Sequence, residues 1–318
     1  MKSIKDLVEN KIVPVITGPT AIGKTDVGIA IAKKINGEII SVDSRQIYKG
    51  LDIGTSKPTL RQQSEISHHL IDLLEIEEKI SAGRCRELAN EAIKGIFSRG
   101  KIPILVGGAG LYIKAIVKGL FKSSRTDQLI REEIRQELKK RGNIYLYNKL
   151  VDIDPDYALK IHINDAKRIT RALELYKMTG KKPSELFKEG SVTLPYNFRI
   201  FILNTKRDYL YDRINKRVDL MIQEGLIDEV RSFLKQGKRS HLEYLLTLGY
   251  KEVIHYLDNK CTKEEMIENL KKNTRQYAKR QLTWFRHQLD GKWIDVKPGE
   301  EPVQVADRIL KILIDAEN

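Results

Sequence analysis

A glycine-rich segment near the start of the chain has the residue types that bind phosphate. Residues 18–25 read Gly-Pro-Thr-Ala-Ile-Gly-Lys-Thr, which is a complete G-x-x-x-x-G-K-[ST] pattern. Glycines let backbone N–H groups turn towards phosphate oxygens, and the N-terminus of a following helix favours an anion. Lys24 can reach a terminal phosphate, and the Thr25 hydroxyl can ligate Mg²⁺. We therefore predict a phosphate site; the alternative is a glycine-rich turn without function.

Two further segments are candidates to face the same ligand. Asp43 follows the apolar run 38–42, and the glycine-rich turn 107–110 follows the apolar run 102–106. In an open α/β sheet, ligands bind beyond the carboxyl ends of the strands. Asp43 could act there as a base or hold Mg²⁺, or it could cap the next segment. The second turn could bring backbone close to a ligand, or be a tight turn only.

Apolar runs and helical periodicities alternate along the first 120 residues, which predicts a parallel α/β sheet. The expected strands are 12–17, 38–42, 68–74, 102–106 and 198–203, and the expected helices between them include 24–35, with Val27, Ala30, Ile31 and Lys34 on its packed face, and 82–98. His68 and His69 are adjacent in a predicted strand, so their side chains should point to opposite faces and should not share a metal.

A highly charged segment interrupts this alternation. Residues 127–190 have helical patterns, and Ile169, Ala172, Leu173 and Tyr176 are spaced as the inner face of one helix. Asn164 or Asp165 would cap that helix, and Gly180 would end it. We predict a core domain of residues 1–121 and 196–318, with a helical insertion domain at 122–195.

The C-terminal half is mostly helical and basic. In the predicted helix 264–288, a helical wheel places four cations on one face, and Leu270, Tyr277 and Trp284 on the opposite face as core residues. The four cations are Lys272, Arg275, Lys279 and Arg286. No carboxylate lies between Lys271 and His287, so this face could follow a phosphate backbone instead of being a merely solvated surface.

Composition agrees with a polyanionic partner. The 318 residues carry a formal net charge of +14, which points most simply to nucleic acid. No run has the about 18 apolar residues of a transmembrane helix, and the N-terminus lacks a signal-peptide core. Cys85 and Cys261 lack disulfide or metal-ligand spacing. We expect a cytoplasmic protein without membrane contact.

Seven segments in the same order resemble a known family. They are GPTAIGKT (18–25), VDSRQIYKGLDIGTSKP (42–58), HHLID (68–72), GGAGLY (107–112), NDAKRITRALELY (164–176), LGYKE (248–252) and TRQYAKRQLTWFR (274–286). This series resembles the motifs of the bacterial tRNA dimethylallyltransferase family, also called tRNA isopentenyl transferases. The resemblance implies a P-loop NTPase-like α/β fold, with a parallel sheet flanked by helices and a helical insertion.

The resemblance also implies a reaction. A dimethylallyl group would pass from dimethylallyl diphosphate to N6 of adenosine 37 in the tRNA anticodon stem-loop, with Mg²⁺ as cofactor and a monomer as the acting form. Asp43 would accept the N6 proton, while Lys24 and Thr25 would act on the diphosphate. The residues implied to bind diphosphate are Gly18, Pro19, Thr20, Ala21, Ile22, Gly23, Lys24 and Thr25, with Arg213 or Arg217.

Other matching positions are implied to contact tRNA. They are Asp43, Ser44, Arg45, Gln46, Ala109, Arg131, Lys167, Arg168, Ile169, Thr170, Arg171, Leu246, Gly249, Tyr250, Lys251, Lys279, Arg280, Gln281, Thr283, Trp284 and Arg286. The family commonly has Thr where this chain has Ala109, so the hydroxyl contact at that turn is missing here.

Three alternative functions remain open at this stage. A small-molecule P-loop kinase would explain residues 12–25, although no kinase lid motif is evident and the basic helix would be unexplained. An adenine-nucleotide prenyltransferase would use the same chemistry on a free nucleotide, but would need neither the insertion nor the basic half. An RNA-binding NTPase would be favoured if Asp43 faced away from the P-loop.

Overall fold

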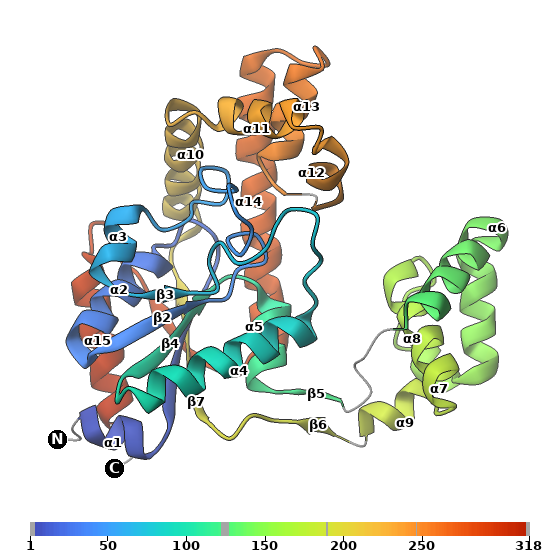
Figure 1. Ribbon diagram of the computed structural model, residues 1–318, viewed down its shortest axis with the longest axis horizontal. Helices are drawn as coiled ribbons and strands as arrows, with labels where there is room; N and C mark the ends of the chain where they lie inside the picture. Colours follow the sequence, from blue (N-terminus) through green and yellow to red (C-terminus); the bar gives the residue numbers. More distant parts are fainter. Residues whose placement is uncertain (1–3, 122–126, 189, 246, 316–318) are drawn as a thin grey trace. The chain divides into compact units, whose positions relative to one another are not determined.

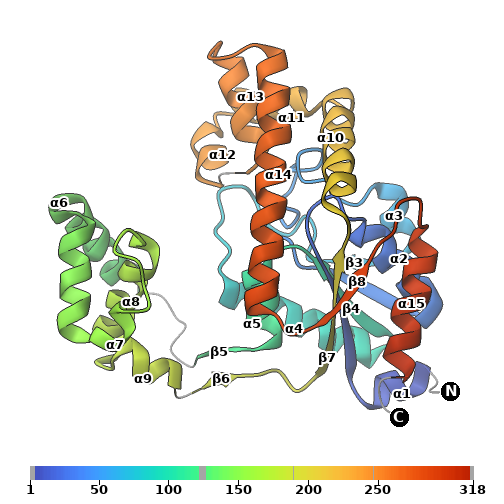
Figure 2. The ribbon, with the colours of Figure 1, turned by 180° about the vertical axis from the view of Figure 1, so that it is seen from behind.

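The computed structural model describes residues 4–121, 127–188, 190–245 and 247–315 (Figures 1 and 2). Contacts divide the chain into two compact units, one formed by Met1–Val117 with Pro195–Asn318 and the other by Lys118–Leu194. The second unit begins and ends close to the expected insertion, 122–195. No helix within the described ranges is both long and apolar enough to span a bilayer.

The first unit is built on a six-stranded sheet with the order β3-β2-β4-β1-β7-β8, in which every neighbouring pair is parallel. The strands are β1 (Ile12–Thr17), β2 (Gly37–Ser41), β3 (His68–His69), β4 (Ile102–Gly107), β7 (Asn197–Asn204) and β8 (Lys292–Asp295). The parallel sheet and five strand positions predicted from the sequence are confirmed. β8 was not predicted, and the run 68–74 forms only a two-residue strand because Leu70 and Asp72 have positive φ angles of 62° and 53°.

Helices cover both faces of this sheet (Figures 1 and 2). One face carries α2 (Lys24–Ile35) and α15 (Pro302–Asp315), and the other carries α4 (Ala82–Ser98) and α5 (Gly110–Val117). Ile16, Ile31 and Ile104 are fully buried between α2 and the strands, so apolar burial fixes the start of α2 above the end of β1. Lys34, expected on the packed face of α2, is exposed. The short helices α1 (Ile4–Glu9) and α3 (Leu60–Glu65) complete the first part of the chain.

The C-terminal helices form a second core beyond the sheet. They are α10 (Arg207–Gln223), α11 (Leu226–Lys235), α12 (Arg239–Leu245), α13 (Tyr250–Leu257) and α14 (Lys263–Gln288). Helix α14 starts with a capping box, in which the Thr262 hydroxyl accepts from the Glu265 N–H at 3.2 Å and the Glu265 carboxylate accepts from the Thr262 N–H at 2.8 Å.

The buried face of α14 differs from the predicted one. Leu270 is buried as expected, but Tyr277 and Trp284 are only half-buried, and the other buried positions are Met266, Thr274, Ala278, Gln281 and Phe285. These positions follow steps of three and four residues, as the buried face of a helix does. Tyr277 lines a cavity beside α14, and Trp284 packs on Gly110, where a Cβ would lie 2.4 Å from its ring. The prediction that Tyr277 and Trp284 belong to the core is therefore wrong.

The second unit is a helical bundle with a short two-stranded antiparallel sheet. Its helices are α6 (Gln128–Ile153), α7 (Pro155–Ala158), α8 (Ala166–Thr179) and α9 (Pro183–Lys188), and β5 (Leu120–Phe121) pairs antiparallel with β6 (Ser191–Val192). The predicted Asp165 cap of α8 is confirmed, since its carboxylate accepts from the Arg168 N–H at 3.1 Å. Gly180 ends α8 with a φ angle of 69°, also as predicted. Tyr176, predicted to face inward, is 37% exposed.

Candidate active site

The segment 18–25 joins the end of β1 to the start of α2. A Cβ at Gly18 would lie 2.7 Å from the Leu203 carbonyl oxygen, and Gly23 has a φ angle of 95°, so this path requires glycine at both positions. Lys24 is the first residue of α2, and its Nζ donates to the Pro19 carbonyl oxygen at 2.8 Å. The segment therefore has the strand, turn and helix start that the phosphate-binding motif requires.

Gln281 of α14 connects this segment to the second glycine-rich turn. Its Oε1 accepts from the Thr20 N–H at 2.9 Å, and its Nε2 donates to the Gly108 carbonyl oxygen at 3.0 Å. A Cβ at Gly108 would lie 2.7 Å from Gln281 Nε2 and 3.6 Å from Lys24 Nζ. Because Gly108 has no side chain, the backbone of this turn can lie close to Gln281 and Lys24. Gln281, expected to contact tRNA, is only 7% exposed and instead ties the two turns together.

Asp43 lies two residues after the end of β2 and faces the same space as Lys24. Its Oδ1 accepts from the Arg45 N–H at 2.8 Å and the Gln46 N–H at 3.4 Å, so it also shapes its own turn. Asp43 therefore both caps its own turn and faces the space beside the P-loop, so the two roles that the sequence left open are compatible. Asp43 is not turned away from the P-loop, and this argues against the RNA-binding NTPase.

Two arginines of α10 form hydrogen bonds with the P-loop. Arg217 donates from Nη1 to the Thr20 hydroxyl at 2.9 Å, and Arg213 donates from Nε to the Ala21 carbonyl oxygen at 2.7 Å. Residues four apart on a helix share a face, which explains why both reach the same loop.

The electrostatic balance at this site favours an anionic ligand. Burial and the charge of Arg217 lower the pKa of Lys24 to about 7, against an opposing effect of Asp43. Burial also lowers the pKa of Arg217 to about 10. Both cations hydrogen-bond to neutral oxygens, as described above, so a phosphate ligand would relieve their mutual repulsion.

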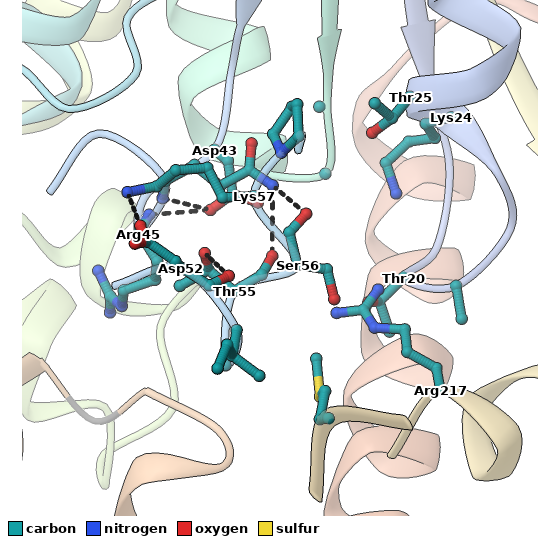
Figure 3. A pocket seen from close by; sticks show the side chains of 18 of the residues that line it. Thr20, Lys24, Thr25, Asp43, Arg45, Asp52, Thr55, Ser56, Lys57 and Arg217 are labelled. Carbon is teal, nitrogen blue, oxygen red and sulfur yellow. Dashed lines mark hydrogen bonds and ion pairs between the residues drawn. The ribbon is translucent and has the colours of Figure 1, made fainter. Parts of the chain in front are cut away.

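These groups surround a cavity of about 1180 Å³. Figure 3 shows Thr20, Lys24, Thr25 and Arg217 on one side of it, and Asp43 with residues of the 52–57 segment on the other. Of the residues predicted for the site, the cavity is lined by Thr20, Ala21, Gly23, Lys24, Thr25, Asp43, Ser44, Arg45, Gln46, Arg213, Arg217, Arg280 and Gln281.

Other cavity residues were not assigned a role from the sequence. The segment Asp52–Pro58 forms one wall, and Tyr277 of α14 forms part of another. Burial, followed by the charge of Asp43, raises the pKa of Tyr277 to about 12, so its phenol stays protonated at neutral pH. The segment 52–58 is part of the motif 42–58 quoted above, and this motif was the signal that could have assigned it to the site. Tyr277 was instead assigned to the core.

The remaining residues predicted to bind tRNA have varied environments in the first unit. Tyr250 is fully buried and Gly249 is buried, so a direct RNA contact by the Tyr250 side chain does not fit this structure. Lys251, Lys279, Thr283 and Arg286 are exposed, while Ala109 and Trp284 are half-buried. Leu246 lies outside the described residues.

In the second unit, α8 presents Lys167 and Arg168 to solvent and Thr170 half-buried. Ile169 is fully buried in the bundle core, so its side chain does not fit an RNA contact either. Arg131 and Arg171 both form ion pairs with the buried carboxylate of Glu174, at 3.2 Å and 3.0 Å.

The donor atoms around the P-loop suit a magnesium ion held partly by a phosphate ligand. Within the described ranges, no cluster of three or more His, Cys, Asp or Glu side chains could hold a metal alone, and the adjacent histidines form no such group. Mg²⁺ usually takes one or two protein oxygens and completes its shell with phosphates and water. The Thr25 hydroxyl and the Asp43 carboxylate both line the cavity and provide such oxygens.

The parallel sheet, the P-loop and the carboxylate that faces it across the cavity define a P-loop α/β protein. The chain belongs to the IPP transferase family, whose model matches residues 46–288. The resemblance seen in the sequence motifs is thereby confirmed.

Similar proteins carry consistent names. The chain is 43% identical to a tRNA dimethylallyltransferase of Thermotoga maritima, covering 95% of this chain and 98% of that protein. It is 47% identical to one from Acetivibrio thermocellus, covering 88% and 90%. A crystal structure of a Bacillus halodurans tRNA isopentenylpyrophosphate transferase matches with a TM-score of 0.69 and 40% identity, covering 96% and 97%. A eukaryotic dimethylallyltransferase acting on tRNA matches with a TM-score of 0.84 and 33% identity, covering 96% of this chain and 79% of that one.

Proposed function

We propose that this protein transfers a dimethylallyl group from dimethylallyl diphosphate to N6 of adenosine 37 in tRNA. The products are N6-dimethylallyladenosine and diphosphate. The observation that carries this proposal is one cavity that holds the P-loop, two cations and Asp43 together. The printed names of the relatives support prenyl transfer to tRNA over the kinase and the free-nucleotide enzyme.

The P-loop side binds the donor and stabilises its leaving group. Breaking the bond between the allylic carbon and the diphosphate oxygen leaves a highly charged anion, which preorganised cations stabilise. Lys24 and Arg217 meet at the Thr20 end of the loop, so we assign both to the diphosphate. Arg213 holds the Ala21 carbonyl and supports the loop's shape. Mg²⁺, held by Thr25 with phosphate oxygens, would neutralise further charge on the leaving diphosphate.

Asp43 acts on the acceptor from the opposite side. The N6 lone pair of adenine is conjugated with the ring, so N6 is a poor nucleophile. As the bond from N6 to the allylic carbon forms, Asp43 accepts the proton that N6 loses. Adenosine 37 must leave the base stack to enter the cavity, and this costs less in a single-stranded loop than in a duplex.

Exposed cations are available for the tRNA phosphates. Lys279 and Arg286 are exposed on α14 and Arg280 lies at the cavity, while Lys167 and Arg168 are exposed on α8. Phosphate contacts of this kind position a nucleic acid without reading its sequence. We propose the monomer as the acting form.

A transfer assay tests the proposal. Protein, Mg²⁺ and radiolabelled dimethylallyl diphosphate are mixed with an anticodon stem-loop carrying adenosines 36 to 38, with AMP and ATP as competing acceptors. We expect label in the stem-loop only. Label in AMP would instead identify a free-nucleotide enzyme, and ATP hydrolysis without label would identify a P-loop NTPase.

The variant Asp43→Asn sharpens this test. An amide oxygen can still accept the Arg45 N–H, so the turn is kept while the base is lost. We expect the transfer rate to fall on the order of 100-fold or more, with donor binding retained. A variant as fast as the wild type would contradict the role of Asp43.

A further inference from the structure

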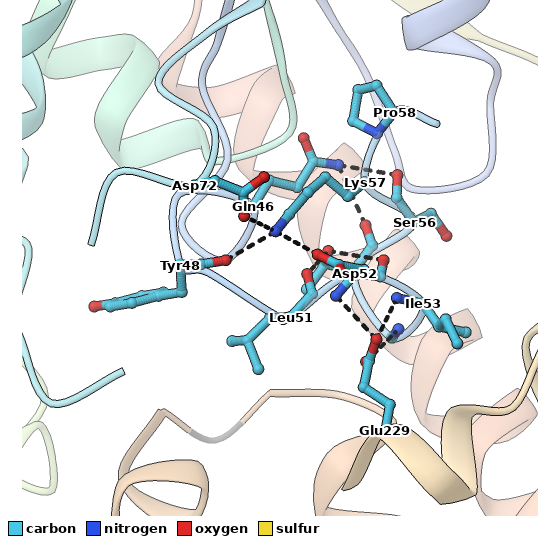
Figure 4. A network of polar contacts seen from close by, with 12 residues as sticks. Gln46, Tyr48, Leu51, Asp52, Ile53, Ser56, Lys57, Pro58, Asp72 and Glu229 are labelled. Atoms are coloured by element: carbon cyan, nitrogen blue, oxygen red, sulfur yellow. Dashed lines mark hydrogen bonds and ion pairs between the residues drawn. The ribbon is translucent and has the colours of Figure 1, made fainter. Parts of the chain in front are cut away.

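A carboxylate from a distant helix holds the cavity wall formed by residues 52–56. Glu229 lies in the first turn of α11, and its Oε2 accepts from the Ile53 N–H at 2.7 Å and the Asp52 N–H at 3.1 Å. Its Oε1 accepts from the Gly54 N–H at 3.2 Å and from the Tyr250 hydroxyl. Figure 4 shows Glu229 pointing at this wall from below. We call Asp52–Ser56 the wall segment.

Neutral donors satisfy this carboxylate. Within the described part of the chain, no Lys or Arg forms an ion pair with Glu229. Burial, followed by the charge of Glu229, raises the pKa of Tyr250 well above its usual value, so the phenol remains a donor. The Tyr250 ring also packs on Gly54, where a Cβ would lie 2.4 Å from Cε2. Backbone N–H groups that converge on one carboxylate fix the backbone that carries them.

The wall segment is tied in turn to the Asp43 turn. Gln46 donates from Nε2 to the Thr55 and Ser56 carbonyl oxygens, at 3.2 Å and 3.1 Å. The backbone N–H of the same Gln46 faces Asp43 Oδ1, and its Oε1 accepts from the Ser41 hydroxyl at 3.0 Å. A hydrogen-bonded path therefore runs from Glu229 through the wall segment to the proposed base.

Lys57 provides a second set of contacts to the wall segment and its neighbours. Lys57 Nζ donates to the Tyr48 carbonyl oxygen at 2.9 Å and to Asp52 at 2.6 Å, and it also binds Asp72 (Figure 4). The Lys57 side chain is only 4% exposed. The Lys57 N–H also donates to the Asp52 carbonyl oxygen and the Ser56 N–H to the Ile53 carbonyl oxygen, both at 3.0 Å, whereas Glu229 accepts from the N–H groups of residues 52–54.

We propose that Glu229 is a positioning residue for the reaction, acting through the wall segment and Gln46 on Asp43. This inference rests on the proposed function. Glu229 touches neither the P-loop nor, in this arrangement, the donor's diphosphate; it sets the geometry of the acceptor side. An error of about 1 Å in such geometry can lower a rate on the order of 100-fold.

The test compares Glu229→Gln with Asp228→Asn. Asp228 is the adjacent residue, is exposed and pairs only with Arg231 among the described residues, so it is a matched control. Single-turnover transfer to the stem-loop is measured with saturating donor and divided by the number of donor-binding sites from equilibrium dialysis. We expect Glu229→Gln to lower this per-site rate about 10-fold or more, with the donor Kd within about two-fold, and Asp228→Asn to match the wild type.

A merely structural role gives a different result. It would lower the melting temperature or the number of binding sites, with an unchanged per-site rate, and that result would overturn the proposal. If Glu229→Gln does not fold, the per-site rate of Tyr250→Phe is measured instead, because this variant removes one of the four donors to Glu229. An unchanged per-site rate would again overturn the proposal. A wild type that transfers no label would reject the proposed function itself, whatever Glu229 does.

Discussion

Lys24 and Lys57 are two of the lysines that line the cavity, and their surroundings are opposite. Lys57 is held by two carboxylates and a carbonyl oxygen, whereas Lys24 hydrogen-bonds to a carbonyl oxygen and lies near the like charge of Arg217. The charge of Lys57 is paired with carboxylates of the protein, whereas the charge of Lys24 remains available to a ligand. We infer that a buried cation is available to a ligand where no carboxylate of the protein forms an ion pair with it.

Replacing Lys24 should give the largest functional effect. We expect Lys24→Met to weaken dimethylallyl diphosphate binding on the order of 100-fold, because the variant loses a preorganised cation. The free energy of unfolding should stay the same or rise, since a desolvated charge is removed. Equilibrium dialysis and urea unfolding measure the two quantities. Unchanged donor binding would show that Lys24 is not a ligand residue.

The pH dependence of diphosphate binding should report the same lysine. With a pKa of about 7, Lys24 is partly neutral in the free protein, and a bound anion favours its charged form. Binding therefore takes up a proton, and the Kd for inorganic diphosphate should rise between pH 7 and pH 9, by up to about tenfold per unit.

Calorimetry on the wild type and on Lys24→Arg measures this effect. Arginine keeps its charge over this range, so the ratio of the two Kd values removes the ionisation of diphosphate itself. A ratio that does not change with pH would contradict the assignment.

Replacing Lys57 should give the smallest effect on binding and a clear effect on stability. Lys57→Met leaves Asp52 and Asp72 without their shared cation, and we expect the free energy of unfolding to fall by about 2 kcal/mol, with solvent screening of these partly exposed carboxylates included. The donor Kd should remain within about two-fold. Urea unfolding and dialysis provide the measurements. If Lys57→Met lost donor binding but kept its stability, Lys57 would act as a ligand residue, and the contrast with Lys24 would be contradicted.

The local structure around the site could be predicted from the sequence. The P-loop, the position of Asp43 after β2 and the second glycine turn each depend on neighbouring residues, whose spacing is visible in the chain. Asp165 and Gly180 bounded α8 for the same reason.

Contacts between distant segments could not be predicted in this way. Glu229 and Gly54 are separated by 175 residues, and Gln281 and Thr20 by 261, so only the folded chain brings them together. The short strand β8 was missed because its four residues alternate weakly and it lies at the edge of the sheet. Tyr277 was misplaced because a helical wheel does not distinguish a side chain in the core from one that lines a cavity.

Gln281 connects α14 to both glycine-rich turns of the cavity. It follows Arg280 on α14 and hydrogen-bonds to both glycine turns, so a shift of α14 moves a partner of the P-loop backbone. If tRNA bound along α14 displaces that amide, the affinity for the donor must change. By thermodynamic linkage, bound donor then changes the affinity for tRNA by the same factor. The coupling between donor binding and tRNA binding would depend, in that case, on a single side-chain amide.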